Sequence, residues 1–185
     1  MALSEIIALG INITAEATRQ SSWKNVDVGY TNLIVPMLAI HDTLIDFDGI
    51  FIGLNETLKI KNVVMRQVAT LGSGQALVTE LMYLVLFDKD GVVPSFGTEI
   101  TFPSTIDEDN VVAVIPIPIA NWIEYKTGYS IAEVECDVIV KGNSTTPNIN
   151  LHGVIIKGNV PLQFTDPNVV SIKLKTIIEG DANDA

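Results

Sequence analysis

Apolar and polar residues alternate with a period of two over several stretches of the chain, which is the pattern of half-buried β-strands. The clearest example is the stretch 132–140, in which apolar residues at even positions alternate with mostly acidic ones. The same period recurs over residues 149–157, 170–178 and 6–18. A short helix over residues 3–9 is the alternative for the last of these stretches.

Two longer apolar runs, Leu58 to Val68 and Ala76 to Asp88, flank the turn-forming sequence Leu-Gly-Ser-Gly at 71–74. This arrangement predicts a β-hairpin. Residues 81–87 are apolar at both parities, which a strand tolerates when both of its faces are covered. We expect one cover to be the opposing sheet and the other to be either the N-terminal residues or a neighbouring subunit.

The N-terminal part of the chain is less regular. Residues 21–32 are polar apart from two aromatics, and we expect a loop there. Residues 35–40 and 43–52 predict two short strands, with turns at His41-Asp42 and near Asp48-Gly49.

The segment after the predicted hairpin is also irregular. Residues 92–110 combine aromatic residues, proline and an acidic cluster, which indicates a long surface connection. Residues 111–115 predict a strand, and because the prolines that follow it cannot donate to a ladder, this strand should lie at an edge or a bend. Residues 121–128 fit one helical turn or a loop.

Together these stretches predict an all-β fold, an antiparallel β-sandwich of jelly-roll type with about eight to ten short strands. We expect residues 58–179 to form the core sandwich and residues 1–57 to be an N-terminal extension or the first strands of the sandwich. Residues 180–185 contain nothing apolar enough to bury, so a flexible acidic tail is expected.

The composition narrows the classes of partner. Hydrophobic residues make up 48% of the chain and charged residues only 18%, which favours extensive burial or surface lost in an assembly. The formal net charge of −11 argues against nucleic-acid binding, which needs clustered Lys and Arg. The most apolar run, residues 33–53, is broken by Pro36, His41 and three aspartates, so no membrane span is expected.

The residues offer little catalytic chemistry. His41 and His152 are the two histidines, and we expect His41 to be solvated at a turn and His152 to be half-exposed on a strand. Because no motif supplies a nucleophile for either, we predict no catalytic residues and no enzymatic activity.

Metal and cofactor sites are not expected either. Asp46-Phe47-Asp48-Gly49 and Asp88-Lys89-Asp90-Gly91 resemble the start of a calcium loop but lack its remaining ligands, and the same sequences suit tight turns. The one cysteine, Cys136, excludes an internal disulfide and is expected to be a small buried apolar residue. No phosphate-binding glycine loop is present, so we predict no cofactor.

Three aromatic residues are the candidate interaction site. Trp122, Tyr125 and Tyr129 form a possible platform for a sugar or a protein partner, since aromatic residues are favoured at interfaces. Packing against the end of the sandwich is the alternative for all three.

Four segments, taken in order, carry a resemblance to a known group of proteins. A strand rich in Ile and Val at 60–64 precedes a strand ending Leu-Phe-Asp at 86–88, a Leu-His-Gly strand at 151–156 and a closing amphipathic strand at 170–178. This order resembles tailed-phage virion proteins of the jelly-roll capsid decoration or auxiliary group, over roughly residues 58–179. The chain departs from that group in residues 1–57, and no active-site residue is carried over.

The resemblance implies a structural role. A protein of this group decorates or cements a phage capsid by binding where capsid subunits meet. Its partners would be the major capsid protein or other virion proteins and further copies of itself, with a trimer favoured. It would be made in the host cytoplasm and located at the capsid surface. The alternative function is a non-catalytic binding module, such as a tail-associated or carbohydrate-recognition β-sandwich.

Overall fold

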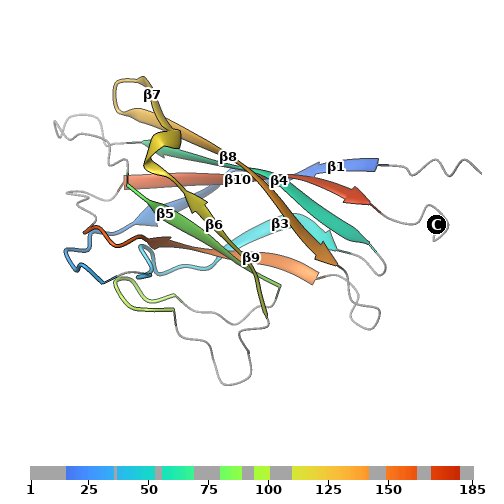
Figure 1. The fold of residues 1–185 in the computed structure, drawn as a ribbon, viewed down its shortest axis with the longest axis horizontal. Helices are drawn as coiled ribbons and strands as arrows, with labels where there is room; N and C mark the ends of the chain where they lie inside the picture. Colours follow the sequence, from blue (N-terminus) through green and yellow to red (C-terminus); the bar gives the residue numbers. More distant parts are fainter. Residues whose placement is uncertain are drawn as a thin grey trace, which may run out of the picture.

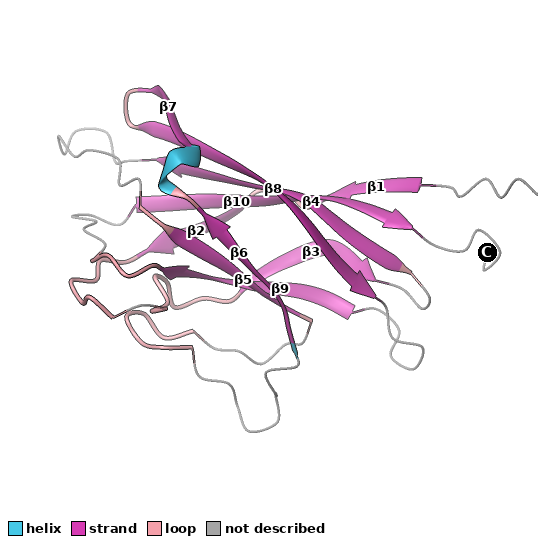
Figure 2. Cartoon of the chain, in the orientation of Figure 1, coloured by secondary structure: helices cyan, strands magenta, loops and turns pink. Residues whose placement is uncertain are grey.

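The computed structural model describes residues 16–35, 37–52, 56–68, 80–88, 94–100, 110–141, 149–161 and 168–179. These residues form two antiparallel β-sheets that lie face to face, with a short 3-10 helix, η2 (Ile119–Asn121), beside them (Figures 1 and 2). The first sheet contains β1 (Glu16–Gln20), β2 (Lys24–Val28), β4 (Thr57–Val68), β7 (Trp122–Lys126), β8 (Tyr129–Lys141) and β10 (Asn168–Glu179). The second sheet contains β3 (Ile45–Ile52), β5 (Met82–Phe87), β6 (Val111–Ile117) and β9 (Ile149–Lys157).

The strands pair in a nested order along the chain. β2 pairs with β10, β3 with β9, β4 with β8 and β5 with β6, each pair antiparallel. The chain is therefore one long antiparallel ribbon folded back on itself. Two further pairings, β10 with β4 and β5 with β9, roll the ribbon into the orders β1-β10-β4-β8-β7 and β3-β9-β5-β6. This winding is that of a jelly roll, so the predicted fold class is confirmed.

Strands β1 and β2 are two parts of one edge, since both pair with β10. Ser21 lies at the break between them, where its hydroxyl accepts a hydrogen bond from the N–H of Leu174 at 2.7 Å. The N–H of Ser21 donates a hydrogen bond to the carbonyl of Leu174 at 3.1 Å. A side-chain oxygen thus replaces a backbone carbonyl, and the ladder continues across the bend.

The main core fills the space between the two sheets. Leu58, Ile60 and Met65 from β4 and Leu84 and Leu86 from β5 are all fully buried in it. Burial of each such side chain contributes on the order of 2 kcal/mol. This packing holds the sandwich together without a disulfide, because Cys136 is a free cysteine.

The predicted hairpin between residues 58 and 88 was wrong. β4 pairs with β10 and β8 in the first sheet, whereas β5 pairs with β6 and β9 in the second. Turn-forming residues show that the chain changes direction, but they do not distinguish a hairpin from a connection between sheets. The C-terminal strands supply the partners of β4, and no local signal identifies them.

The prediction that β5 is covered on both faces was correct. Its inward residues lie in the main core, while Val85 and Phe87 point outward and are 4% and 0% exposed. They belong to a second apolar cluster with Ala39, against which Leu44 and Ile100 pack. The outer cover seen here comes from the chain itself, partly from the first 50 residues.

Three local predictions need correction. Residues 24–28 are strand β2 and not a loop, with Val26 and Val28 buried and the residues between them exposed. This alternation is too short to recognise in the sequence. Residues 122–126 are strand β7, and neither the predicted helical turn nor the predicted loop, because they pair with β8. Asp48 lies inside β3, where the register with β9 is irregular between Asp46 and Phe51, so no turn occurs there.

Other predictions were confirmed. β8, β9 and β10 cover the three alternating stretches of the C-terminal third, and β6 lies at the edge of its sheet as its prolines required. The predicted strand over residues 6–18 and the alternative helix over 3–9 lie largely outside the described residues, as do the tail at 180–185 and the turn at 71–74. Within the described part of the chain, no helix is long and apolar enough to cross a membrane.

Candidate interaction surface

The three aromatic residues predicted to form a platform do not all lie together on the surface. Trp122 is 8% exposed and belongs to the main core, as the packing alternative required. Tyr125 is 56% exposed, and its ring centroid lies 6.3 Å from that of the half-buried Tyr129. The ammonium of Lys126 lies 4.8 Å from the Tyr129 ring. The structure therefore brings Tyr125 and Tyr129 together, and their role in binding stays a prediction.

Both histidines are buried, contrary to the sequence prediction. His41 is 1% exposed, and its Nε2 atom accepts a hydrogen bond from the N–H of Ile155 at 2.8 Å. This bond requires an unprotonated Nε2, and desolvation by burial lowers the pKa of His41 to about 4. His41 therefore serves as a neutral hydrogen-bond acceptor at the edge of β9.

His152 lies next to a carboxylate. It is 7% exposed, and its Nδ1 atom is 2.6 Å from an Oδ1 of Asp46 on the neighbouring strand β3. A histidine and a carboxylate in contact make two parts of a hydrolytic triad. Among the described residues, no serine hydroxyl or cysteine thiol lies in hydrogen-bond contact with His152, and the pair joins the neighbouring strands β3 and β9.

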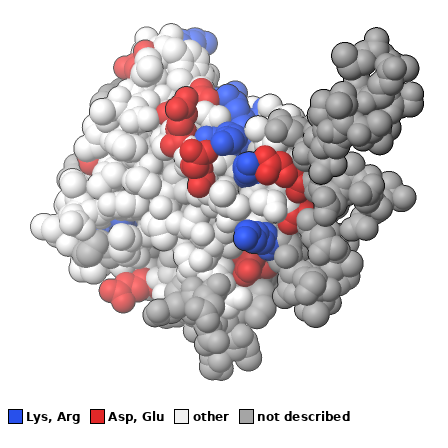
Figure 3. Space-filling view, turned by 45° about the vertical axis from the view of Figure 1, so that its right-hand side comes forward, with Lys and Arg blue, Asp and Glu red and all other residues white. Residues whose placement is uncertain are grey.

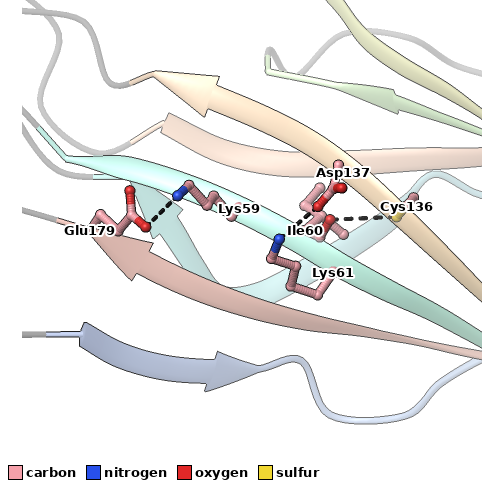
Figure 4. A network of polar contacts seen from close by, with 6 residues as sticks. All are labelled: Lys59, Ile60, Lys61, Cys136, Asp137 and Glu179. Atoms are coloured by element: carbon pink, nitrogen blue, oxygen red, sulfur yellow. Dashed lines mark hydrogen bonds and ion pairs between the residues drawn. The ribbon is translucent and has the colours of Figure 1, made fainter.

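Charged side chains gather on the outer face of the first sheet, where red and blue atoms lie side by side in Figure 3. Lys59 on β4 pairs with Glu179 on β10, and Lys61 on β4 pairs with Asp137 on β8 at 2.6 Å (Figure 4). The Lys61 ammonium holds the pKa of Asp137 below its usual range, and that carboxylate in turn raises the pKa of Lys61. The charges on this face thus neutralise each other locally.

An open cleft lies beside this network, lined by Lys61, Asn62, Glu135, Cys136 and Asp137. It forms where the register between β4 and β8 shifts, between Ile60 and Asn62. The Cys136 thiol points back toward the carbonyl of Ile60 at 3.5 Å, and partial burial raises the pKa of the thiol, which favours its protonated form. No group of three or more metal-ligating side chains occurs among the residues that the structure describes.

The connection between β2 and β3 exposes a cluster of large apolar side chains. We call it the 30–37 surface, and it consists of Tyr30, Leu33, Ile34, Val35 and Met37 together with Phe96. Ile34 is 73% exposed and Leu33 is 55% exposed, while the other four are 41–45% exposed. Single exposed apolar residues are normal on proteins, but a cluster of this kind marks an interaction site.

Backbone hydrogen bonds to β9 fix the conformation of residues 37–40 in this connection. The N–H of Met37 donates to the carbonyl of Lys157 at 3.2 Å, and the N–H of Lys157 donates to the carbonyl of Leu38 at 3.0 Å. The N–H of Ile40 continues the series to the carbonyl of Ile155 at 3.1 Å. Met37 has a φ of 61°, an unfavourable value for a residue with a side chain, and these bonds hold it there.

A buried ammonium group supports the connection from beneath. Lys157 is fully buried, and its Nζ atom donates a hydrogen bond to the carbonyl of Leu33. Burial lowers the pKa of Lys157, because desolvation disfavours the charged form. Burying a charged ammonium group costs folding free energy unless the group has a hydrogen-bond partner. The Leu33 carbonyl is such a partner, so this contact ties the connection to β9.

Residues 95–98 support the same surface from a second side. The N–H of Ala39 donates to the carbonyl of Thr98 at 3.0 Å, and the N–H of Gly97 donates to the carbonyl of Ala39 at 2.8 Å. The Phe96 ring packs on Gly29, where an added Cβ atom would overlap the ring. In Figure 1 the blue segment after β2 and the light-green segment of residues 94–100 lie near each other at the lower left.

Sequence reasoning did not identify this surface. The sequence prediction divided this connection into a loop over residues 21–32 and a strand over 35–40. Neither prediction treated the exposed apolar residues as one surface. The available signal was the run Leu33-Ile34-Val35, three consecutive apolar residues that neither an alternating strand nor an ordinary polar loop explains.

Comparisons with known proteins give structural similarities and no sequence family. No family model matches the chain, and no curated protein matches it in sequence. A chain of Cocksfoot mottle virus is similar in structure, with 5% identity over 89% of this chain and 96% of that one, at a TM-score of 0.35. The BFDV capsid protein, in its 60-mer, has 11% identity over 95% and 98% of the two chains, at a TM-score of 0.30.

A chain of Mud Crab Dicistrovirus is also similar, with 10% identity over 91% of this chain and 73% of that one, at a TM-score of 0.27. All three similar structures are of viruses or a viral capsid protein. At these TM-scores the backbones diverge over much of their length. The jelly-roll assignment therefore depends on the nested strand pairing of this chain, and the tailed-phage resemblance stays a prediction.

Proposed function

We propose that this protein is a structural component of a virion that decorates or cements a capsid through protein–protein contacts. The observation that carries the proposal is the 30–37 surface, a cluster of exposed apolar side chains on a connection fixed by hydrogen bonds on two sides. Apolar surface held in one conformation loses little conformational entropy on binding, so it suits a protein–protein contact. The jelly-roll sandwich gives this contact a rigid support.

The proposed partners are the major capsid protein or other virion proteins and further copies of this chain, for which the phage resemblance favours a trimer. The net charge of −11 would keep such a protein away from the packaged genome. The role needs no catalytic residue. The protein would act at the capsid surface after synthesis in the host cytoplasm.

Density-gradient sedimentation of a virus stock that carries this gene tests the proposal. An antibody against the protein should detect it in the fractions that contain intact particles, at a constant ratio to the major capsid protein. Detection only in the soluble fractions at the top of the gradient would refute the virion role.

A second candidate function is a carbohydrate-binding module, favoured by the exposed Tyr125 ring beside Tyr129. Exposed aromatic faces next to hydrogen-bonding side chains suit sugar rings. A glycan array with the wild-type protein and Tyr125→Ala tests this function. Binding that the substitution abolishes would support it, and absence of binding across the array would refute it.

A further inference from the structure

We propose that the 30–37 surface is the contact through which one copy of this chain binds a second copy. The inference rests on the proposed structural role and makes it specific by naming the surface and its occupant. Around a two-fold axis the surface would meet a copy of itself. Its apolar side chains would then be buried in the assembly and not left in water.

Charge is the first argument for a second copy as the occupant. Each chain carries a net charge of −11, so two copies repel each other over most approaches. Residues 30–37 and 95–98 contain no Asp, Glu, Lys or Arg. When two copies meet at this surface, these segments bring no carboxylates close together. The repulsion that remains comes from charges elsewhere on the two chains, and the burial of apolar side chains has to outweigh only that repulsion.

Area is the second argument. Six side chains are 41–73% exposed. If each is counted at about 150–250 Å², the range for aromatic side chains, they present at most roughly 450–750 Å² of surface. A contact between two copies would bury about twice that area, which reaches the low end of standard-size interfaces. The expected complex is therefore reversible and depends on protein concentration.

The fixed conformation of the surface is the third argument. Hydrogen bonds from residues 155–157 and 97–98 hold the connection in place, and the buried Lys157 ammonium binds the carbonyl of Leu33. These bonds reduce the order that has to be gained at Leu33 and at residues 37–40 when a partner binds.

Sedimentation velocity of the purified protein tests the proposal without any virion, so its outcome is independent of the gradient test above. The monomer has a mass of 20.0 kDa. The weight-average mass should rise above this value between micromolar and hundreds of micromolar protein. Association should strengthen in high salt, because salt screens the repulsion between acidic chains while apolar contacts persist.

Substitutions of Ile34 locate the contact. Both Ile34→Asp and Ile34→Lys should weaken association by about tenfold or more, since each places a charge at the centre of an apolar contact. The matched control is Ile123→Asp, because Ile123 is 63% exposed on β7 and lies outside the 30–37 surface. This control should associate as the wild type does, and circular dichroism should show that all three variants are folded.

Three results would overturn the proposal. The first is a wild-type protein that stays at the monomer mass at every concentration and salt level. The second is an equal loss of association in the Ile34 and Ile123 variants. The third is weakening by Ile34→Asp but not by Ile34→Lys, which would assign the effect to net charge and not to apolar packing.

Discussion

Acidification should destabilise the folded protein through His41. This side chain is 1% exposed and accepts the Ile155 N–H through Nε2, and burial lowers its pKa from 6.5 to about 4. The nearby Asp42 carboxylate acts in the opposite direction and does not outweigh desolvation. The imidazole is therefore neutral in the folded chain at pH values where the unfolded chain is already protonated.

The sign and size of the effect follow from proton linkage. Between pH 6.5 and about 4 the unfolded state binds the additional proton, so the contribution of His41 to stability is complete above pH 6.5 and is lost as the pH falls. At about 1.4 kcal/mol for each pH unit, this window corresponds to a loss of about 3 kcal/mol. Below pH 4 this residue should contribute no further change.

Urea denaturation of the wild type and of His41→Gln at several pH values between 7 and 4 measures the effect. The glutamine can still accept the Ile155 N–H through its side-chain oxygen but does not titrate. The free energy of unfolding of the wild type should therefore fall more steeply with acidification, by up to about 3 kcal/mol over the window. Parallel curves for the two proteins would refute the assignment of His41 as a buried neutral acceptor.

Three further predictions concern the core, the outer face and the free thiol. Leu84→Ala should lower the free energy of unfolding by about 2–5 kcal/mol, because Leu84 is fully buried. Val114→Ala, at a 49% exposed position, should change it by less than about 0.5 kcal/mol. Urea titration measures both effects. The Arg66 guanidinium lies 3.4 Å from the centroid of the Trp23 ring, so Arg66→Ala should cost about 0.5–2 kcal/mol and change the tryptophan fluorescence, while an unchanged spectrum would contradict the contact. Cys136 should react slowly with a thiol reagent at pH 7 and rapidly after unfolding in urea, and equal rates would show that burial does not protect it.

The sequence predicted the longer strands, either from a clear alternation or from a continuous apolar run, and missed the short strands β2 and β7. β8 was found because its outer positions, acidic at 133, 135 and 137, alternate with apolar residues over 132–140. β7 was missed because only Trp122 is buried and the four residues after it are exposed. Its pairing with β8 stabilises that segment as a strand, and pairing of this kind is not visible in a local pattern.

Long-range contacts also decided the features of the candidate surface. The burial of His41 depends on the Ile155 N–H, which is distant in the sequence. The position of Leu33 in the 30–37 surface likewise depends on a hydrogen bond from Lys157, which is also distant in the sequence. Composition predicted extensive burial or surface lost in an assembly, and the residues that expose apolar surface became evident only when β9 and residues 95–98 were placed beside them.

Hydroxyl-radical footprinting of the 30–37 surface, in the free protein and in the particle fraction, tests the central claim most directly. Tyr30 and Met37 are oxidisable side chains that are 45% and 43% exposed in the single chain. The account predicts that both are oxidised in the dilute free protein and strongly protected in the particle, while Tyr125 serves as an internal reference away from the surface. Equal oxidation of Tyr30 and Met37 in the two samples would contradict the claim that this surface forms the structural contact.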